Sequence, residues 1–309
     1  MRIAFFGLPL AAWLLHLDGH QLDPVVLSPL PAPGRRRVKR LFGAKLIDAL
    51  ELPTRELEAQ VQAALPGADL LLSWFWTRKL PPRWLSACPR GAFGVHPSLL
   101  PRHRGPDPFF WAIDCGDSLT GVSLHRLEAE YDTGAVIWQD FLGVGELTAW
   151  QLAKALDRPS LRLLRRAAGD LAAGLSLPEQ RQDERLATAA PAPSGDLLKC
   201  PWREPGPVVL RRVRALSPQP GVALELRGLR FDLLDAQIDD DLPLALRPGE
   251  AFITAGSSAG VLIRTGSGGV RLLRARLESG AEVDAAGLAE LVSVQTEVLE
   301  CSPILGGNQ

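Results

Sequence analysis

The feature that most constrains the fold is a series of short apolar runs, each ending at a turn-forming residue, with helical segments between them. Residues 68–73 (ADLLLS) contain a continuous apolar run, as expected of a central strand in a parallel sheet whose two faces are both covered. Residues 1–7 (MRIAFFG) form a similar run, and residues 8–17 then have a helical pattern with Pro9 in the first turn. We therefore predict an α/β domain with a doubly wound, mostly parallel sheet.

Further elements extend this pattern. Residues 25–28 form another short apolar strand, and a proline-rich loop follows at 29–34. A helix is predicted at 56–65. A long amphipathic helix within residues 147–174 is expected to cover the sheet.

The pattern changes at residue 178, where the sequence becomes polar, aperiodic and rich in proline and alanine (PEQRQDERLATAAPAPSGD). Such a composition is typical of an interdomain linker. A helix is predicted at 208–216, and strand-like alternations separated by glycine or proline turns follow at 223–226, 229–235, 250–254, 261–265 and 270–277. Short strands at this spacing indicate a small β-barrel. The predicted parts are an α/β domain at 1–177, a linker at 178–200 and a barrel domain at 201–305.

Composition excludes several other classes of protein. The chain has 309 residues with 46% hydrophobic content and a formal net charge of −1, so nothing global requires a nucleic-acid partner. Four cysteines lie far apart without C-x-x-C spacing, which indicates neither a zinc site nor a disulfide framework. Because no long apolar run and no cleavable leader are present, we expect an unexported, cytoplasmic protein with no membrane segment. We also expect a monomer.

One histidine and one aspartate lie in turns that the predicted sheet can bring together. Residues 91–95 form a short strand that Pro97 ends, so His96 lies at the carboxyl end of a strand, where open α/β sheets bind ligands. A second strand at 121–127 leads into an acidic turn that contains Asp132. A carboxylate paired with an imidazole fixes its tautomer and raises its basicity. From these two residues alone, ordinary turn roles are equally tenable.

Two other segments have both a structural and a functional interpretation. Five cations follow the proline-rich loop within six residues: Arg35, Arg36, Arg37, Lys39 and Arg40. Short basic runs are usually solvated surface, and the alternative is a loop that contacts nucleic-acid phosphates. Three aromatic residues at 74–76 follow the strand at 68–73. They could pack in the core or line a slot for a flat heterocycle.

The segments HPSLLPRHRG, WAI and TGVSLHRLEAEYDTG, with their spacing, resemble the folate-dependent formyltransferases over residues 70–140. The methionyl-tRNA and sugar-amine formyltransferases are the most similar branches. The resemblance implies 10-formyltetrahydrofolate as formyl donor, an amine as acceptor and no metal. It also implies catalytic roles for His96 and Asp132. The carboxyl-terminal segment around 214–221 resembles the entry to the family's oligonucleotide-binding-like domain.

Gly94 departs from the family pattern, which has asparagine at this position. The only asparagine in the chain is Asn308, so no other asparagine can replace it. Losing one oxyanion donor typically costs roughly 10²–10³ in turnover. We expect the missing side chain to leave room for one or two waters, so that Gly94→Asn raises turnover, or lowers it if the substrate itself fills that space. We expect no second base beside His96 and Asp132.

The resemblance also implies the binding residues. Folate contacts are expected from two loops and the acidic turn: Trp76, Thr77, Arg78, Lys79, Leu80, Ser98, Leu99, Leu100, Pro101, Glu130 and Tyr131. In methionyl-tRNA formyltransferases a basic insertion at the place of residues 35–40 reaches the acceptor stem, which favours initiator methionyl-tRNA as acceptor. The local sequence at 74–80 favours instead a nucleotide-linked amino sugar or other small amine. Gly94 alone favours a folate-binding homologue with little activity.

Overall fold

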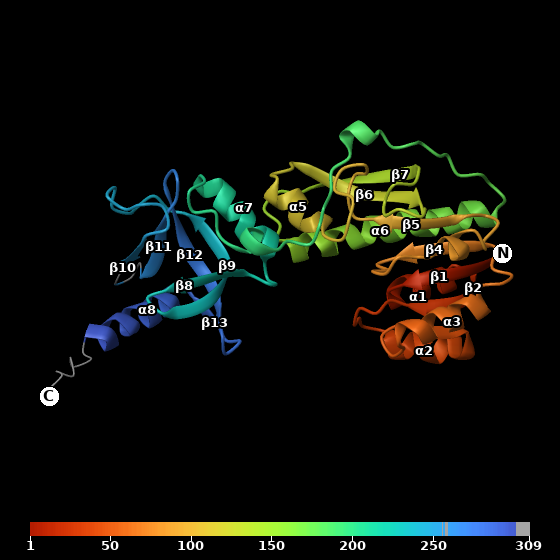
Figure 1. Cartoon of the computed structure of the whole chain (residues 1–309), viewed down its shortest axis with the longest axis horizontal. Coiled ribbons are helices and arrows are strands. Elements are labelled where there is room, and N and C mark those ends of the chain that lie inside the picture. The colour runs from red at the N-terminus through yellow and green to blue at the C-terminus, as the bar shows by residue number, and fades with distance from the viewer. Residues whose placement is uncertain (255, 257–258, 301–309) are drawn as a thin grey trace, which may run out of the picture. The chain divides into compact units, whose positions relative to one another are not determined.

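The computed structural model describes residues 1–254, 256 and 259–300, and for 294–300 only the backbone is described. The chain forms two compact units (Figure 1). The first comprises Met1–Pro108, Leu119–Gly143 and Ala153–Ala192. The second comprises Phe109–Ser118, Val144–Leu152 and the residues from Pro193 onward. Two short segments from within the expected first domain thus pack with the second unit.

The first unit is built on a seven-stranded sheet with the order β3-β2-β1-β4-β5-β6-β7. Strands β1 to β5 are parallel, and β6 and β7 are antiparallel to their neighbours. This confirms the predicted doubly wound, mostly parallel sheet. The strands are β1 (Arg2–Gly7), β2 (Gln21–Leu27), β3 (Leu46–Asp48), β4 (Leu70–Trp74), β5 (Ala92–His96), β6 (Leu119–Arg126) and β7 (Val136–Gly143).

Helices flank this sheet. They are α1 (Pro9–Leu17), α2 (Arg35–Phe42), α3 (Thr54–Ala64), α4 (Pro82–Leu85) and α6 (Ala149–Ala172), with short 3-10 turns at η1 (Gly43–Lys45) and η2 (Glu184–Leu186). Helix α5 (Pro108–Asp114) lies almost entirely in the second unit. Helix α1 has proline at its first position, where the missing N–H has no intrahelical partner in any case. Helices α1 and α3 pack against β2, and the apolar face of α3 joins Phe6, Leu71 and Trp84 in the core.

The functional interpretation of residues 35–40 placed them in a loop, whereas the structure places them in α2, of which they form most. Val38 is buried at 2% exposure, so the segment gains a hydrophobic anchor. Arg35 and Lys39 are four residues apart and therefore lie on one face of the helix. Both pair with the buried Asp48. Burial alone would raise the pKa of Asp48, but the hydrogen bonds from Lys39, a backbone N–H and Arg35 lower it.

The second unit contains a six-stranded antiparallel sheet with the order β10-β11-β12-β9-β8, to which β13 adds beside β12. The elements are η3 (Gly195–Leu198), α7 (Gly206–Leu216), β8 (Val222–Leu226), β9 (Leu229–Ile238), β10 (Ala251–Thr254), β11 (Gly260–Arg264), β12 (Gly269–Leu277), β13 (Glu282–Asp284) and α8 (Ala285–Glu300). The predicted helix and five strands are confirmed, as is a small β-domain. Strand β13 and helix α8 were not anticipated.

Among the described residues, none of the helices combines the length and apolarity that a membrane crossing requires.

Candidate active site

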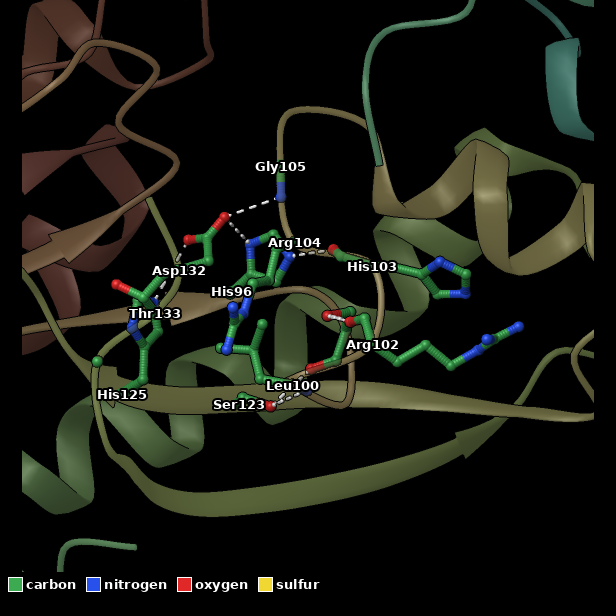
Figure 2. Close-up of polar contacts among 12 residues, drawn as sticks. His96, Leu100, Arg102, His103, Arg104, Gly105, Ser123, His125, Asp132 and Thr133 are labelled. Atoms are coloured by element: carbon green, nitrogen blue, oxygen red, sulfur yellow. Dashed lines mark hydrogen bonds and ion pairs between the residues drawn. The ribbon is translucent and has the colours of Figure 1, made fainter. Parts of the chain in front are cut away.

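His96 and Asp132 lie side by side in the first unit. His96 is the last residue of β5, and Asp132 lies in the turn between β6 and β7. The Nδ1 atom of His96 is 3.5 Å from the Asp132 Oδ2 atom. Their side chains are 8% and 15% exposed, so the pair is largely shielded from water. Figure 2 shows the carboxylate of Asp132 directed at the imidazole.

The loop after β5 holds both side chains. The His96 Nε2–H donates to the His103 carbonyl at 2.8 Å, because a carbonyl can only accept. The Gly105 N–H donates to Asp132 Oδ2 at 2.9 Å (Figure 2). Asp132 has φ +58°, a left-handed conformation that aspartate tolerates better than most residues. In the neutral imidazole, Nδ1 is thus the nitrogen that can accept a proton, and Asp132 would stabilise the resulting cation.

A second histidine, His125 on β6, lies on the other side of the carboxylate. Its Nε2 is 3.6 Å from Asp132 Oδ1, and its Nδ1–H donates to the Arg126 carbonyl at 2.9 Å. Burial lowers the pKa of His125 to about 4, with Asp132 opposing and His96 reinforcing this shift. At neutral pH His125 is therefore uncharged. A second imidazole thus lies beside Asp132, which was not anticipated from the sequence, but its lowered pKa makes it a weaker base than an ordinary histidine.

The antiparallel register explains why His125 was missed. Gly94 of β5 is paired with His125 of β6, and His96 is paired with Ser123. His125 is thereby placed one strand away from the His96 side chain, with ring centroids 6.5 Å apart. The alternation of residues 121–127 predicted a strand, but not which residues of β5 would face it. Without that register, the sequence did not indicate that His125 lies near His96 and Asp132.

The Leu127 side chain lies over Gly94, where room for one or two waters was expected from the sequence. A Cβ atom built on Gly94 would lie 2.8 Å from the Leu127 Cδ2 atom and 3.4 Å from its Cγ atom. Leu127 is partly buried and packs against the same core cluster as Trp76. Its backbone N–H donates to the Ala92 carbonyl at 2.8 Å, which fixes it beside β5. An apolar side chain therefore covers the position from which asparagine would donate a hydrogen bond.

The structure brings the loop at 76–80 close to the acidic turn. The Lys79 Nζ atom is 3.7 Å from Glu130 Oε1 and 5.9 Å from the centroid of the Tyr131 ring. The sole tyrosine of the chain, Tyr131, is 56% exposed. Thr77 is exposed as well, whereas Leu80 is buried in the core. Lys79, Glu130 and Tyr131 thus form one surface.

Trp76 and Arg78 have polar atoms without partners. The Trp76 ring packs edge-on against Phe6 with centroids 5.3 Å apart, as the core-packing interpretation predicted. Nevertheless, its Nε1 atom and the Arg78 Nη1 atom are buried and make no hydrogen bond. Buried donors are rarely left unpaired, since each costs about 1–3 kcal/mol. Both atoms are therefore candidates for contacts with a bound ligand.

The loop at 98–101 is held internally. The Ser98 hydroxyl donates to the Arg102 carbonyl at 2.6 Å, and the Ser123 hydroxyl donates to the Ser98 carbonyl at 2.7 Å. The Leu100 N–H donates to the Ser123 hydroxyl at 3.0 Å (Figure 2). The Leu99 side chain lies over Gly121, and the Pro101 carbonyl accepts from a later backbone N–H. The polar atoms of this loop therefore already have partners within the protein, and the Ser98 side chain serves to shape the loop.

Within the described ranges, no three histidine, cysteine or acidic side chains are grouped as a metal ion would require.

Comparisons with known proteins show which family this chain resembles. The formyl transferase model matches residues 32–166, and the formyl transferase C-terminal domain model matches residues 199–291. The methionyl-tRNA formyltransferase of Anaeromyxobacter dehalogenans (strain 2CP-C) is 34% identical, over 90% of this chain and 92% of that protein. The methionyl-tRNA formyltransferase of Herpetosiphon aurantiacus is 31% identical, over 88% and 92%.

Solved structures share the fold at lower identity. HypX from Aquifex aeolicus, in complex with tetrahydrofolic acid, has a TM-score of 0.66 at 20% identity, over all of this chain and 50% of that one. The N-formyltransferase from Helicobacter canadensis has a TM-score of 0.65 at 12% identity, over 88% and 98%.

The two-unit architecture and the sequence matches define a group-transfer enzyme. More particularly, the chain belongs to the formyl transferase family, as the sequence predicted.

Proposed function

We propose that the protein transfers the formyl group of 10-formyltetrahydrofolate to the amino group of methionyl-tRNA. The observation that carries this proposal is the buried His96–Asp132 pair in a chain 34% identical to a methionyl-tRNA formyltransferase over nine-tenths of its length. In the reaction, a C–N bond forms between the amine and the formyl carbon, and the bond from that carbon to N10 of the folate breaks. The amine loses a proton, and N10 gains one.

His96 and Asp132 are suited to carry this proton. The attacking amine becomes more acidic as its nitrogen gains positive charge, and a neutral His96 beside a carboxylate can accept the proton. The resulting ion pair keeps the proton close until the leaving nitrogen needs it. Because Leu127 covers the position of the family asparagine, the developing oxyanion lacks that donor. We therefore expect turnover below that of relatives that retain asparagine there.

The partnerless donors support a folate at the loop 76–80. A folate offers heterocyclic nitrogen, carbonyl and carboxylate acceptors that could pair with Trp76 Nε1 and Arg78 Nη1. We expect Trp76→Phe to weaken binding of 5-formyltetrahydrofolate about 5- to 10-fold, since one hydrogen bond contributes about 1 kcal/mol. Isothermal titration calorimetry measures this affinity, with the exposed Trp150→Phe as matched control. Equal affinity of the Trp76 variant and wild type would place the folate elsewhere.

The basic helix α2 is the proposed contact with the tRNA backbone, and the structure divides its cations into two groups. Arg35 and Lys39 are engaged with acidic side chains of the protein, with Lys39 Nζ 2.8 Å from Asp48 and 2.5 Å from Glu51. Arg36 and Arg40 are exposed. Arg37 is also exposed and stacks on Trp13, with its guanidinium carbon 3.8 Å from the ring centroid.

The salt dependence of tRNA binding tests this contact. Each phosphate contact contributes roughly 0.7–0.9 to the slope of log affinity against log salt concentration. The double variant Arg36→Ala/Arg40→Ala should therefore flatten the slope by about 1.4–1.8. The exposed pair Arg55→Ala/Arg158→Ala removes the same charge elsewhere and is the matched control. Identical slopes for both double variants would remove α2 from the interface.

Several arginines of the second unit are paired with acidic side chains, so they contribute less net positive charge than their number suggests. Each of four sheet arginines has an acidic partner within 3.4 Å: Arg230 with Glu225, Arg271 with Asp239, Arg274 with Glu282 and Arg276 with Asp232. Ion pairs of this kind keep the sheet surface close to neutral. A tRNA contact there would rely on shape and hydrogen bonding more than on charge.

A nucleotide-linked amino sugar is the second candidate acceptor, favoured by the sequence at 74–80. Formylation assays with methionyl-tRNA and with such a sugar, using the same donor, separate the two proposals. Formyl transfer to the sugar alone would replace the tRNA proposal. Folate binding without transfer to either acceptor would favour a homologue of little activity. A cytoplasmic location and a monomeric state remain predictions.

A further inference from the structure

The segment 178–192, which the sequence presents as a linker, is bound along its length to the candidate active site. At one end, Gln180 and Val136 exchange backbone hydrogen bonds of 2.8 and 2.9 Å. At the other end, the Arg104 N–H donates to the Thr188 carbonyl at 2.8 Å, and the Ala190 N–H donates to the Arg104 carbonyl at 2.6 Å. The segment therefore joins the start of β7 to the loop that holds His96 and Asp132.

Gln182 lies at the centre of this segment and is half-buried. Its amide nitrogen donates to the carbonyls of Asp132 at 2.8 Å and Gly134 at 2.7 Å. Its amide oxygen accepts from Arg104 Nε at 3.0 Å and Nη2 at 2.7 Å. Both donor hydrogens and both acceptor lone pairs of the amide are used. Only an amide provides two donors toward the turn and an acceptor toward the guanidinium.

Arg104 connects Gln182 to the residues that hold the catalytic pair. It lies between His103, whose carbonyl accepts from His96, and Gly105, whose N–H donates to Asp132. The Arg104 guanidinium also makes two hydrogen bonds of 2.8 Å with Glu184. Such a planar, two-point contact fixes orientation as well as distance. The loop of residues 103–105 is therefore held from one side by His96 and Asp132 and from the other by Gln182 and Glu184.

We infer that Gln182 is a positioning residue of the active site, which holds the backbone of Asp132 in register with His96. The inference rests on the proposed function. Without Gln182, the carbonyls of Asp132 and Gly134 lose their donor, and the left-handed Asp132 can relax away from His96. A displacement of about 1 Å at a reacting group can cost 10²-fold in rate. The folate loop at 76–80 is not bound to Gln182, so donor binding should persist.

Two substitutions test the inference. Gln182→Ala removes the whole amide, and Gln182→Glu keeps the size and the acceptor for Arg104 but places oxygen against two carbonyls. We expect both to lower kcat about 10- to 100-fold, with KM for the formyl donor changed less than about 2-fold. Gln180→Ala, two residues away and exposed, should retain wild-type kinetics. A kcat within 2-fold of wild type for Gln182→Ala would overturn the inference, as would a parallel rise in KM.

A second readout does not depend on turnover, so it separates this inference from the proposed function. The imidazole ¹⁵N resonances of His96, identified by comparison with His96→Ala, report the environment of Nδ1 beside Asp132. We expect them to shift in Gln182→Ala and Gln182→Glu and to stay unchanged in Gln180→Ala. Unchanged resonances in all three variants would overturn the inference even in an active enzyme. Shifted resonances in a protein that formylates no amine would support it while refuting the proposed function.

Discussion

Gly94→Asn introduces the asparagine that the family resemblance implies for this position, and we expect this change alone to fail. The Cβ atom alone would approach Leu127 Cδ2 to 2.8 Å, closer than folded proteins allow, and the carboxamide extends further. The Leu127 side chain must therefore move, and overpacking of this kind costs about 1–3 kcal/mol. Because Leu127 lies where the new side chain would begin, we expect the carboxamide to be displaced from the orientation that an oxyanion donor needs.

Removing the Leu127 side chain as well should let the asparagine introduced at position 94 act as the oxyanion donor. Leu127→Ala alone is expected to cost about 1–3 kcal/mol, less than for a fully buried leucine because Leu127 is only partly buried. In Gly94→Asn/Leu127→Ala the two changes relieve each other, so the double variant should be more stable than the sum of the single effects predicts. Its turnover should exceed that of wild type by up to roughly 10²-fold, whereas neither single variant should gain more than about 3-fold.

Urea unfolding of the four proteins measures the stability coupling, and a discontinuous formyl-transfer assay at saturating donor measures turnover. The wild type and Leu127→Ala serve as controls for the fold and for the enlarged space. Additive stability effects would show that Leu127 does not obstruct position 94. A gain in Gly94→Asn alone, equal to that of the double variant, would refute the steric reasoning and support the original expectation from sequence.

Three further predictions concern charge. The pKa of His125 is about 4 in the folded protein and 6.5 unfolded, so its stabilising contribution is complete above pH 6.5 and is lost as pH falls toward 4. His125→Leu should lose on the order of 2–3 kcal/mol less than wild type between pH 7 and pH 4, measured by urea unfolding at both values; equal losses would contradict this assignment. His96→Ala and Asp132→Asn should each lower kcat at least 10²-fold with donor affinity retained, and near-normal turnover of either would reject the proton-transfer role. Arg212 makes two hydrogen bonds of 2.7 and 3.0 Å to the Asp114 carboxylate at 11% exposure, so Arg212→Ala should destabilise the second unit by about 3–5 kcal/mol in thermal unfolding; a change below 1 kcal/mol would show that water replaces the pair.

The sequence alone determined the features that depend on neighbouring residues. Apolar runs of strand length with helical segments between them specify an α/β unit. A short continuous apolar run suits a buried strand, whereas an apolar period of 3.6 residues suits a helix with one buried face. His96 could be placed at a strand end because Pro97 has no N–H with which to continue the ladder. The strands of the second unit were located for the same reason, since glycine and proline mark each turn.

Tertiary structure decided what depends on residues distant in the chain. The basic run at 35–40 forms a helix because that conformation pairs Arg35 and Lys39 with Asp48 and buries Val38. Neither Asp48 nor the core that surrounds Val38 is part of the run itself. The side chain covering Gly94 comes from the end of a neighbouring strand, and the register of that strand places His125 beside Asp132. Gln182 reaches the same turn from 50 residues further along the chain. Local pattern specifies each element, but only packing selects which of their side chains meet, because that choice is made by the sum of contacts in the folded unit.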